Sequence, residues 1–156
     1  MKRLCTIEDC DVLGDGAKLE WIAKAAIDSD GSDNRHSDPC WQPQTTLSHN
    51  GRPVDAESVP YIVVPPAIVR GVVGVVMGCK AVVTNTMTGQ QTRAVVADIG
   101  PKTKLGEMSC ECARRIGLSG NPNHGGTSRK IIKYEIWPGV PACVDGVTYR
   151  LQSAKA

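Results

Sequence analysis

Short apolar runs rich in valine and isoleucine recur along the second half of the chain, and glycine, proline or polar residues separate them. Runs of this length and composition are typical of β-strands. A polar segment, residues 84–92 (TNTMTGQQT), predicts a hairpin loop between two of them. Six strands with few helices predict a mostly β fold, a small closed barrel that leaves no sheet edge exposed. The predicted strands lie within residues 59–65, 71–78, 80–86, 92–100, 129–139 and 146–152.

Two segments have helical features instead. In residues 106–120 (GEMSCECARRIGLSG), Met108, Cys112 and Ile116 recur every four positions and form one apolar stripe. This pattern predicts a helix of about eleven residues, which is stable only if it packs on the barrel. Residues 17–31 (AKLEWIAKAAIDSDG) are rich in helix-forming residues, so propensity alone predicts a second helix there.

The length and composition fit one folded domain. The chain has 156 residues, of which 41% are hydrophobic, enough for a packed core. Residues 1–16 are expected to be a poorly ordered lead-in, and residues 17–156 a single domain, present as a monomer. The net charge of +2 is too small to favour nucleic acid as a partner.

The start of the chain, MKRLCTIEDC, has basic residues but no apolar run after them. It therefore predicts no signal peptide, and no other stretch is long and apolar enough to span a membrane. We expect synthesis in the cytoplasm with reduced thiols, so that action outside the cell would need a non-classical export route. The seven cysteines are not spaced as zinc ligands, and their odd number leaves at least one unpaired.

Charge is distributed unevenly along the chain. Residues 1–60 contain 6 Lys or Arg and 11 Asp or Glu, whereas residues 61–156 contain 12 and 5. An acidic segment that faces a cleft would attract a cationic substrate. The same charges are equally typical of a solvated surface, so both interpretations stay open.

The strand predicted within residues 92–100 ends on an aspartate and a Gly-Pro turn. Strand alternation places Asp98 at the barrel rim, where Gly100 can take a positive φ and Pro101 stiffens the turn. Glu107 is expected at or near the first turn of the next helix, whose positive end favours its ionised form. Two such carboxylates suit glycoside hydrolysis, with Asp98 as general acid and Glu107 as general base. The spacing alone equally fits a turn residue and a helix-start residue without catalytic roles.

Residues 94–118 (AVVADIGPKTKLGEMSCECARRIGL) resemble the core motif of the chitosanases of glycoside hydrolase family 75. That motif has an aspartate, then Gly-Pro, then Gly-Glu, then a helix of small residues. Four further segments resemble other parts of that family, in the same order along the chain. They are AIDSDGSD (residues 26–33), DPCWQPQTTL (38–47), VDAESVPYIVVP (54–65) and NPNHGGTSRKIIKYEIWPG (121–139).

This resemblance implies an endo-acting, inverting hydrolase of chitosan, without a metal or organic cofactor, in which Asp98 and Glu107 are the catalytic pair. It also implies that residues 21–31 are extended, against their helical propensity. A weaker likeness, in the strand–Asp-x-Gly-Pro–helix unit, is to double-psi β-barrels, and it implies a six-stranded barrel with one packed helix.

The resemblance also suggests substrate-binding residues. Asp28, Asp30 and Asp38 stand in the family-like motifs and are expected to pair with the ammonium groups of glucosamine. Gln44, in QPQTT, is expected to bind sugar hydroxyls. Residues 28–39 also invite a calcium interpretation, but the glycine is fourth rather than sixth and no glutamate is twelfth, so we predict no metal.

Two rival functions remain at this level. The chain is short and lacks the family's usual secretion signal. A muramidase or lytic transglycosylase acting on peptidoglycan, such as an injected effector or lysin, would fit the same scaffold. A carbohydrate-binding module without catalysis is the second rival. In all three cases the predicted partner is a polysaccharide.

Overall fold

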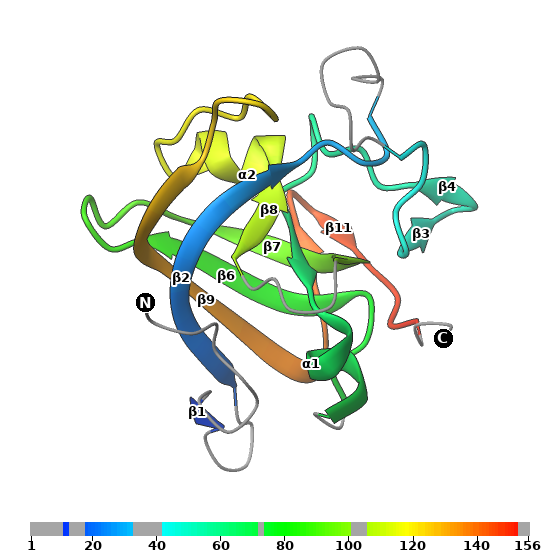
Figure 1. Ribbon diagram of the computed structural model, residues 1–156. Helices are drawn as coiled ribbons and strands as arrows, with labels where there is room; N and C mark the ends of the chain where they lie inside the picture. The colour runs from blue at the N-terminus through cyan, green and yellow to red at the C-terminus, as the bar shows by residue number, and fades with distance from the viewer. Residues whose placement is uncertain (1–10, 13–17, 33–41, 72–73, 101–105, 153–156) are drawn as a thin grey trace.

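A computed structural model describes residues 11–12, 18–32, 42–71, 74–100 and 106–152. Six strands form a closed barrel in the order β2-β8-β5-β7-β6-β9, and β9 pairs back with β2 (Figure 1). The predicted small six-stranded barrel with a packed helix is therefore confirmed. The barrel strands are β2 (Leu19–Asp28), β5 (Tyr61–Val64), β6 (Cys79–Asn85), β7 (Gln91–Ile99), β8 (Glu107–Ser109) and β9 (Thr127–Pro141).

The remaining described elements are short and lie around the barrel. Two helices occur, α1 (Pro66–Gly71) and α2 (Cys110–Arg115), so one helix more than predicted is present. No helix in the described ranges has the length and apolar character needed to cross a membrane. The short strands are β1 (Asp11–Val12) beside β2, the pair β3 (Ser48–His49) and β4 (Arg52–Pro53), and the pair β10 (Cys143–Val144) and β11 (Val147–Thr148).

Four of the predicted strands fold as expected, as β5, β6, β7 and β9. The predicted hairpin is confirmed, because β6 and β7 pair antiparallel from Lys80–Val95 to Thr84–Gln91. The strand predicted within residues 71–78 is wrong. Gly74 and Gly78 have φ of 90° and 96°, which interrupts an extended run, and only Met77 forms an isolated bridge. Within residues 146–152, only β11 forms.

The helix that propensity predicts at residues 17–31 is wrong, and the extended conformation implied by the family resemblance is found. Residues 19–28 form β2, a ten-residue strand that pairs with β9 on one side and β8 on the other, whereas the extended conformation does not continue through the turn at Asp30 and Gly31. Leu19, Trp21, Ala23 and Ala25 are buried on its inner face, and Trp21 stacks on Tyr134 of β9. Burial against two neighbouring strands outweighs the helical preference of the sequence.

The predicted helix at residues 106–120 is shorter than expected. It begins at Cys110 after the N-cap Ser109, whose Oγ accepts a hydrogen bond from the Cys112 amide at 3.2 Å. The predicted apolar stripe is buried. Glu107 is therefore not in the first helical turn but starts β8. This strand fills the gap between β2 and β5 and so closes the barrel.

Candidate functional site

Strand register brings the predicted catalytic carboxylates to one rim of the barrel. Asp98 on β7 is opposite Val63 on β5, and Val63 is opposite Glu107 on β8. Glu107 is in turn opposite Ala26 on β2, two residues before Asp28. Asp98 and Glu107 are thus separated by one intervening strand, which puts their Cα atoms about 10 Å apart.

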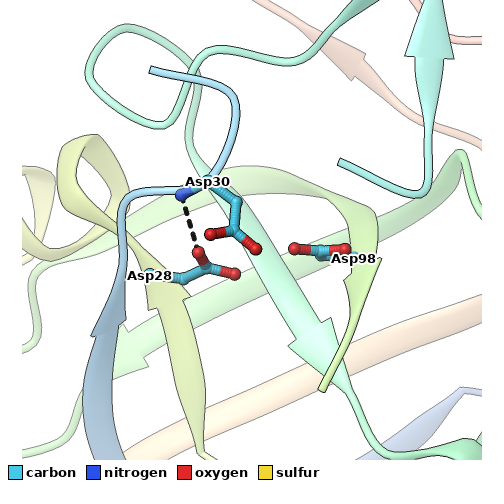
Figure 2. A group of neighbouring side chains, drawn as sticks. All are labelled: Asp28, Asp30 and Asp98. Atoms are coloured by element: carbon cyan, nitrogen blue, oxygen red, sulfur yellow. Dashed lines mark hydrogen bonds between the residues drawn. The ribbon is translucent and has the colours of Figure 1, made fainter. Parts of the chain in front are cut away.

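Three aspartates converge at this rim (Figure 2). Asp28 ends β2, Asp30 follows it after one residue, and Asp98 lies near the end of β7. One carboxyl oxygen from each lies within 4.8 Å of the others. The amide of Asp30 donates to Asp28 Oδ1 at 2.7 Å, which holds the two neighbouring side chains in register.

Asp98 is held from a segment far away in the sequence. Its Oδ1 accepts hydrogen bonds from the Thr46 amide at 3.1 Å and from the Thr46 hydroxyl at 2.9 Å. The Ile99 amide also donates to this oxygen, at 3.1 Å. Asp98 is only 6% exposed, so these three donors replace water around one of its oxygens.

The electrostatic environment keeps protons on this cluster. Burial raises the pKa of Asp28 to about 9, and the charges of Asp98 and Asp30 add to the effect. Burial also raises the pKa of Asp30 to about 7, with the hydrogen bond to Asp98 as the next cause. No ion pair among the described residues involves any of the three aspartates. Within the described part of the chain, these carboxyls therefore share the rim without an ion-pair partner.

An open cleft of about 420 Å³ lies beside the cluster. Asp30 and Asp98 form its acidic wall, and its other described lining residues are uncharged. The amides and hydroxyls in this lining can hydrogen-bond to a sugar, whereas the carboxyls can attract a cationic group. The uncharged lining residues are Gln42, Pro43, Gln44, Thr45, Thr46 and Ile99.

Glu107 is close to the cluster but is not among the described residues that line the cleft. It is half-buried, and its charge is one of the causes that raise the pKa of Asp28. A Cβ atom on Gly100 would lie 3.3 Å from Glu107 Oε1 and 2.9 Å from Val63 Cγ1. Gly100 is therefore needed for close packing at the rim.

Gly100 can take a positive φ but does not do so here, since its φ is outside that region. Pro101 lies outside the described residues. Because Glu107 precedes the helix by three residues, the argument that the helix end favours its ionised form fails as well.

The predicted substrate-binding residues differ in their position relative to the cleft. Asp30 and Gln44 line the cleft, whereas Asp28 is buried behind it at 6% exposure. Asp38 lies outside the described residues. Thr46 and Gln42, which hold Asp98 and Asp30, were not predicted. The only sequence signal for them is their place at the two ends of the family-like QPQTT segment.

The aspartate cluster is the one group in the described part of the chain with the spacing of a shared cation site. The same spacing lets carboxyls share protons. Asp28 Oδ1 and Asp30 Oδ1 already accept backbone amides, at 2.7 and 2.8 Å, and Asp98 Oδ1 accepts three donors. One oxygen of each aspartate is thus already bound to a donor, and acidic spacing alone does not make a metal site.

No protein-family model matches this sequence, and a search of curated proteins finds no match either.

Proposed function

We propose that the protein is an endo-acting glycoside hydrolase that cleaves the β-1,4 bonds of chitosan with inversion. The observation that carries this proposal is the open polar cleft whose acidic wall contains Asp98. Glu107 lies on the same rim, and strand β5 separates it from the strand of Asp98. The resemblance of residues 94–118 to family 75 chitosanases supports the same pair of residues.

In the proposed reaction, a carboxyl group of the acidic wall, which contains Asp98, protonates the glycosidic oxygen. Glu107 takes a proton from a water molecule, which attacks the anomeric carbon from the opposite face. Inverting enzymes separate the two carboxyls by about 6.5–9.5 Å to leave room for this water. A Cα separation of about 10 Å across β5 is compatible with such an arrangement.

The charge of the cleft supports a cationic sugar. Its described lining contains two carboxyls and no lysine or arginine. Glucosamine units of chitosan carry ammonium groups at mildly acidic pH, and these can pair with the acidic wall. Deacetylated units also lack the acetamide that can serve as an internal nucleophile, so the enzyme must supply its own base.

The experiment that tests the function compares substrates and variants. Reducing ends released from chitosan, chitin and peptidoglycan are measured for the wild type, Asp98→Asn and Glu107→Gln. We expect activity on chitosan, with a loss of several orders of magnitude in each variant. Matched controls are Asp55→Asn and Glu57→Gln, which make the same chemical changes outside the cleft lining. A wild type inactive on all three polymers would reject the proposal.

Stereochemistry gives a separate test. NMR of the first product formed should show the inverted anomer. Retention would exclude Glu107 as a base that activates water, because in retaining enzymes the two carboxyls are only about 5 Å apart and one of them attacks the sugar itself.

One observation favours a lytic transglycosylase of peptidoglycan as the second candidate. Glu107 is not among the described residues that line the cleft, and a transglycosylase needs only one acid/base residue because the sugar's own hydroxyl attacks. In that case Glu107→Gln keeps much of the wild-type rate. Mass spectrometry would then find products with anhydro-sugar ends.

A further inference from the structure

Two of the three rim aspartates have no role in a two-carboxylate mechanism. Asp30 nevertheless lines the cleft beside Asp98, and their carboxyl groups point toward one another (Figure 2). We propose that Asp30 and Asp98 are one proton-sharing pair, in which Asp30 carries the proton and is a further catalytic residue on the acid side. This inference rests on the proposed function, because it names the proton donor of that reaction.

The hydrogen bonds of Asp98 make it the acceptor of the pair. Its Oδ1 accepts both donors of Thr46 and the Ile99 amide. An oxygen that accepts three hydrogen bonds cannot carry a proton as well, and donors of this kind favour the charged form of a carboxylate. The proton of the pair is therefore not on Oδ1 of Asp98.

Asp30 is held in the position that a proton donor requires. Its amide is bound to Asp28 Oδ1, and its carbonyl accepts the Tyr61 hydroxyl at 3.0 Å. The Gln42 amide donates to Asp30 Oδ1 at 2.8 Å, and we assign the proton to the second oxygen, Oδ2. Asp30 is also half-buried at the cleft, whereas Asp28 is almost wholly buried. Of the two, Asp30 can reach a substrate.

The neighbouring groups oppose two negative charges on the pair. Asp28 faces it from β2 and Glu107 interacts with the cluster from β8, both acidic. Among the described residues, the other titratable neighbours are Tyr61 of β5 and Cys110 of α2, and burial raises the pKa of both. Neither can supply a positive charge, and no described ion pair reaches the cluster. One retained proton relieves the repulsion, as in other close carboxyl pairs.

The reaction balances with this assignment. The pair gives its proton to the glycosidic oxygen as the bond between that oxygen and the anomeric carbon breaks. Water forms the new bond to carbon and loses one proton to Glu107. The pair is then doubly charged and Glu107 neutral, and exchange with solvent returns each to its starting state.

The first experiment measures the proton directly. Aspartate labelled with ¹³C at Cγ is followed by NMR through a pH titration of the wild type and of Asp28→Asn, Asp30→Asn and Asp98→Asn. The signal that disappears in each variant assigns the carboxyls that titrate at high pH. We expect the Asp30 signal to titrate well above the usual aspartate range, and its midpoint to fall in Asp98→Asn, since a neutral amide replaces a like charge. An Asp30 that titrates in the ordinary range, or an Asp30 midpoint that Asp98→Asn leaves unchanged, overturns the pair.

The second experiment measures its role in catalysis. In the pH profile of kcat/KM, Asp30→Asn should move the basic limb about one unit or more to lower pH and lower the value at pH 7 about 100-fold. The double variant Asp30→Asn/Asp98→Asn should be no slower than Asp98→Asn, because the two act as a unit. Asp55→Asn, the matched control, should leave limb and rate unchanged. The inference is overturned if Asp30→Asn leaves the basic limb of the kcat/KM profile in place, or if the two single variants lower kcat/KM additively in the double variant.

The two experiments separate failure of the inference from failure of the function. If the wild type cleaves none of the polymers, the proposed function fails and the NMR titration alone decides whether the pair shares a proton. If the wild type is active but Asp30 titrates normally, the function stands and the pair is rejected.

Discussion

Two regions of this molecule each contain three carboxyl groups, but only one region pairs them with arginines among the described residues. Beside α2, Arg114 lies 2.9 Å from Glu57, and Arg115 lies 2.8 Å from Glu111 and 2.7 Å from Asp145. At the rim, Asp28, Asp30 and Asp98 lie together without a described ion pair. The Arg115 hydrogen bond lowers the pKa of Asp145, whereas burial raises that of Asp28.

The difference separates two uses of charge. The carboxylates beside α2 are partly exposed and matched by arginines, an arrangement that costs little and stabilises little. The rim aspartates are buried close together without an ion pair among the described residues, and such burial destabilises the folded state. A fold that keeps such a cluster beside an open cleft is typical of a functional site, because perturbed pKa values gather at sites of chemistry.

The largest expected effect concerns activity. Glu107→Gln and Asp98→Asn should each lower kcat/KM on chitosan by about three orders of magnitude or more, because each removes one proton-transfer group. Glu111→Gln, the same change beside α2, should keep the wild-type rate. Kinetics of reducing-end release check this contrast. If Glu111→Gln is as damaging as Glu107→Gln, the two regions do not differ in function.

A large effect on stability is expected where the two regions meet. Ser109 is fully buried, donates to the Val59 carbonyl at 2.7 Å and accepts from the Tyr61 amide and the α2 amide of Cys112. Ser109→Ala leaves these groups unpaired and should lower the free energy of unfolding by about 3 kcal/mol. Urea denaturation should give the same loss at pH 5 and pH 8, because no titratable group is removed.

The rim should respond to pH in the opposite direction to most acidic clusters. Folding raises the pKa of Asp28 to about 9 and of Asp30 to about 7, so the folded state binds more protons than the unfolded state above about pH 4. Stability should therefore fall as pH rises from about 4 through 9. Asp28→Asn keeps the oxygen that accepts the Asp30 amide and should raise the unfolding free energy by on the order of 2 kcal/mol at pH 8.

Denaturation from pH 4 to pH 9 checks this prediction for wild type and variant together. The advantage of Asp28→Asn should shrink toward pH 4, where the wild-type carboxyl is protonated in both states. Glu57→Gln, beside α2, is the control and should show no such gain. A wild type whose stability rises steadily from pH 5 to pH 9 would mean that cations compensate the rim aspartates.

The sequence predicted Asp98 at the rim better than it predicted the strand β8 that carries Glu107. The alternating apolar run of β7 identifies both the strand and the position of Asp98 near its end. The three-residue strand β8 was assigned to a helix, because Met108 continues the four-residue spacing of Cys112 and Ile116. A strand this short has no periodicity of its own. Only closure of the barrel between β2 and β5 specifies it.

Contacts between segments far apart in the chain could not be predicted from the sequence either. Thr46 binds Asp98 across 52 positions, and neither residue type nor spacing signals that bond. The aspartates at residues 28 and 30 were chosen as ligands of a cationic sugar. Their burial, which raises both pKa values, and the hydrogen bond from the Asp30 amide to Asp28 both depend on the folded rim.

The smallest expected effect lies on the paired side of the comparison. Asp145→Asn removes the charge that Arg115 binds, and because Asp145 is 57% exposed we expect a loss of only about 0.5 kcal/mol in unfolding free energy. The pKa of Asp145 is lowered in the folded state, so this contribution should be present at pH 7 and vanish as pH falls below about 4. Added salt should weaken it as well. Urea denaturation at low and high salt measures both. A loss as large as that of Ser109→Ala would show that the ion pairs beside α2 stabilise the fold, and that surface exposure is not what distinguishes the two acidic regions.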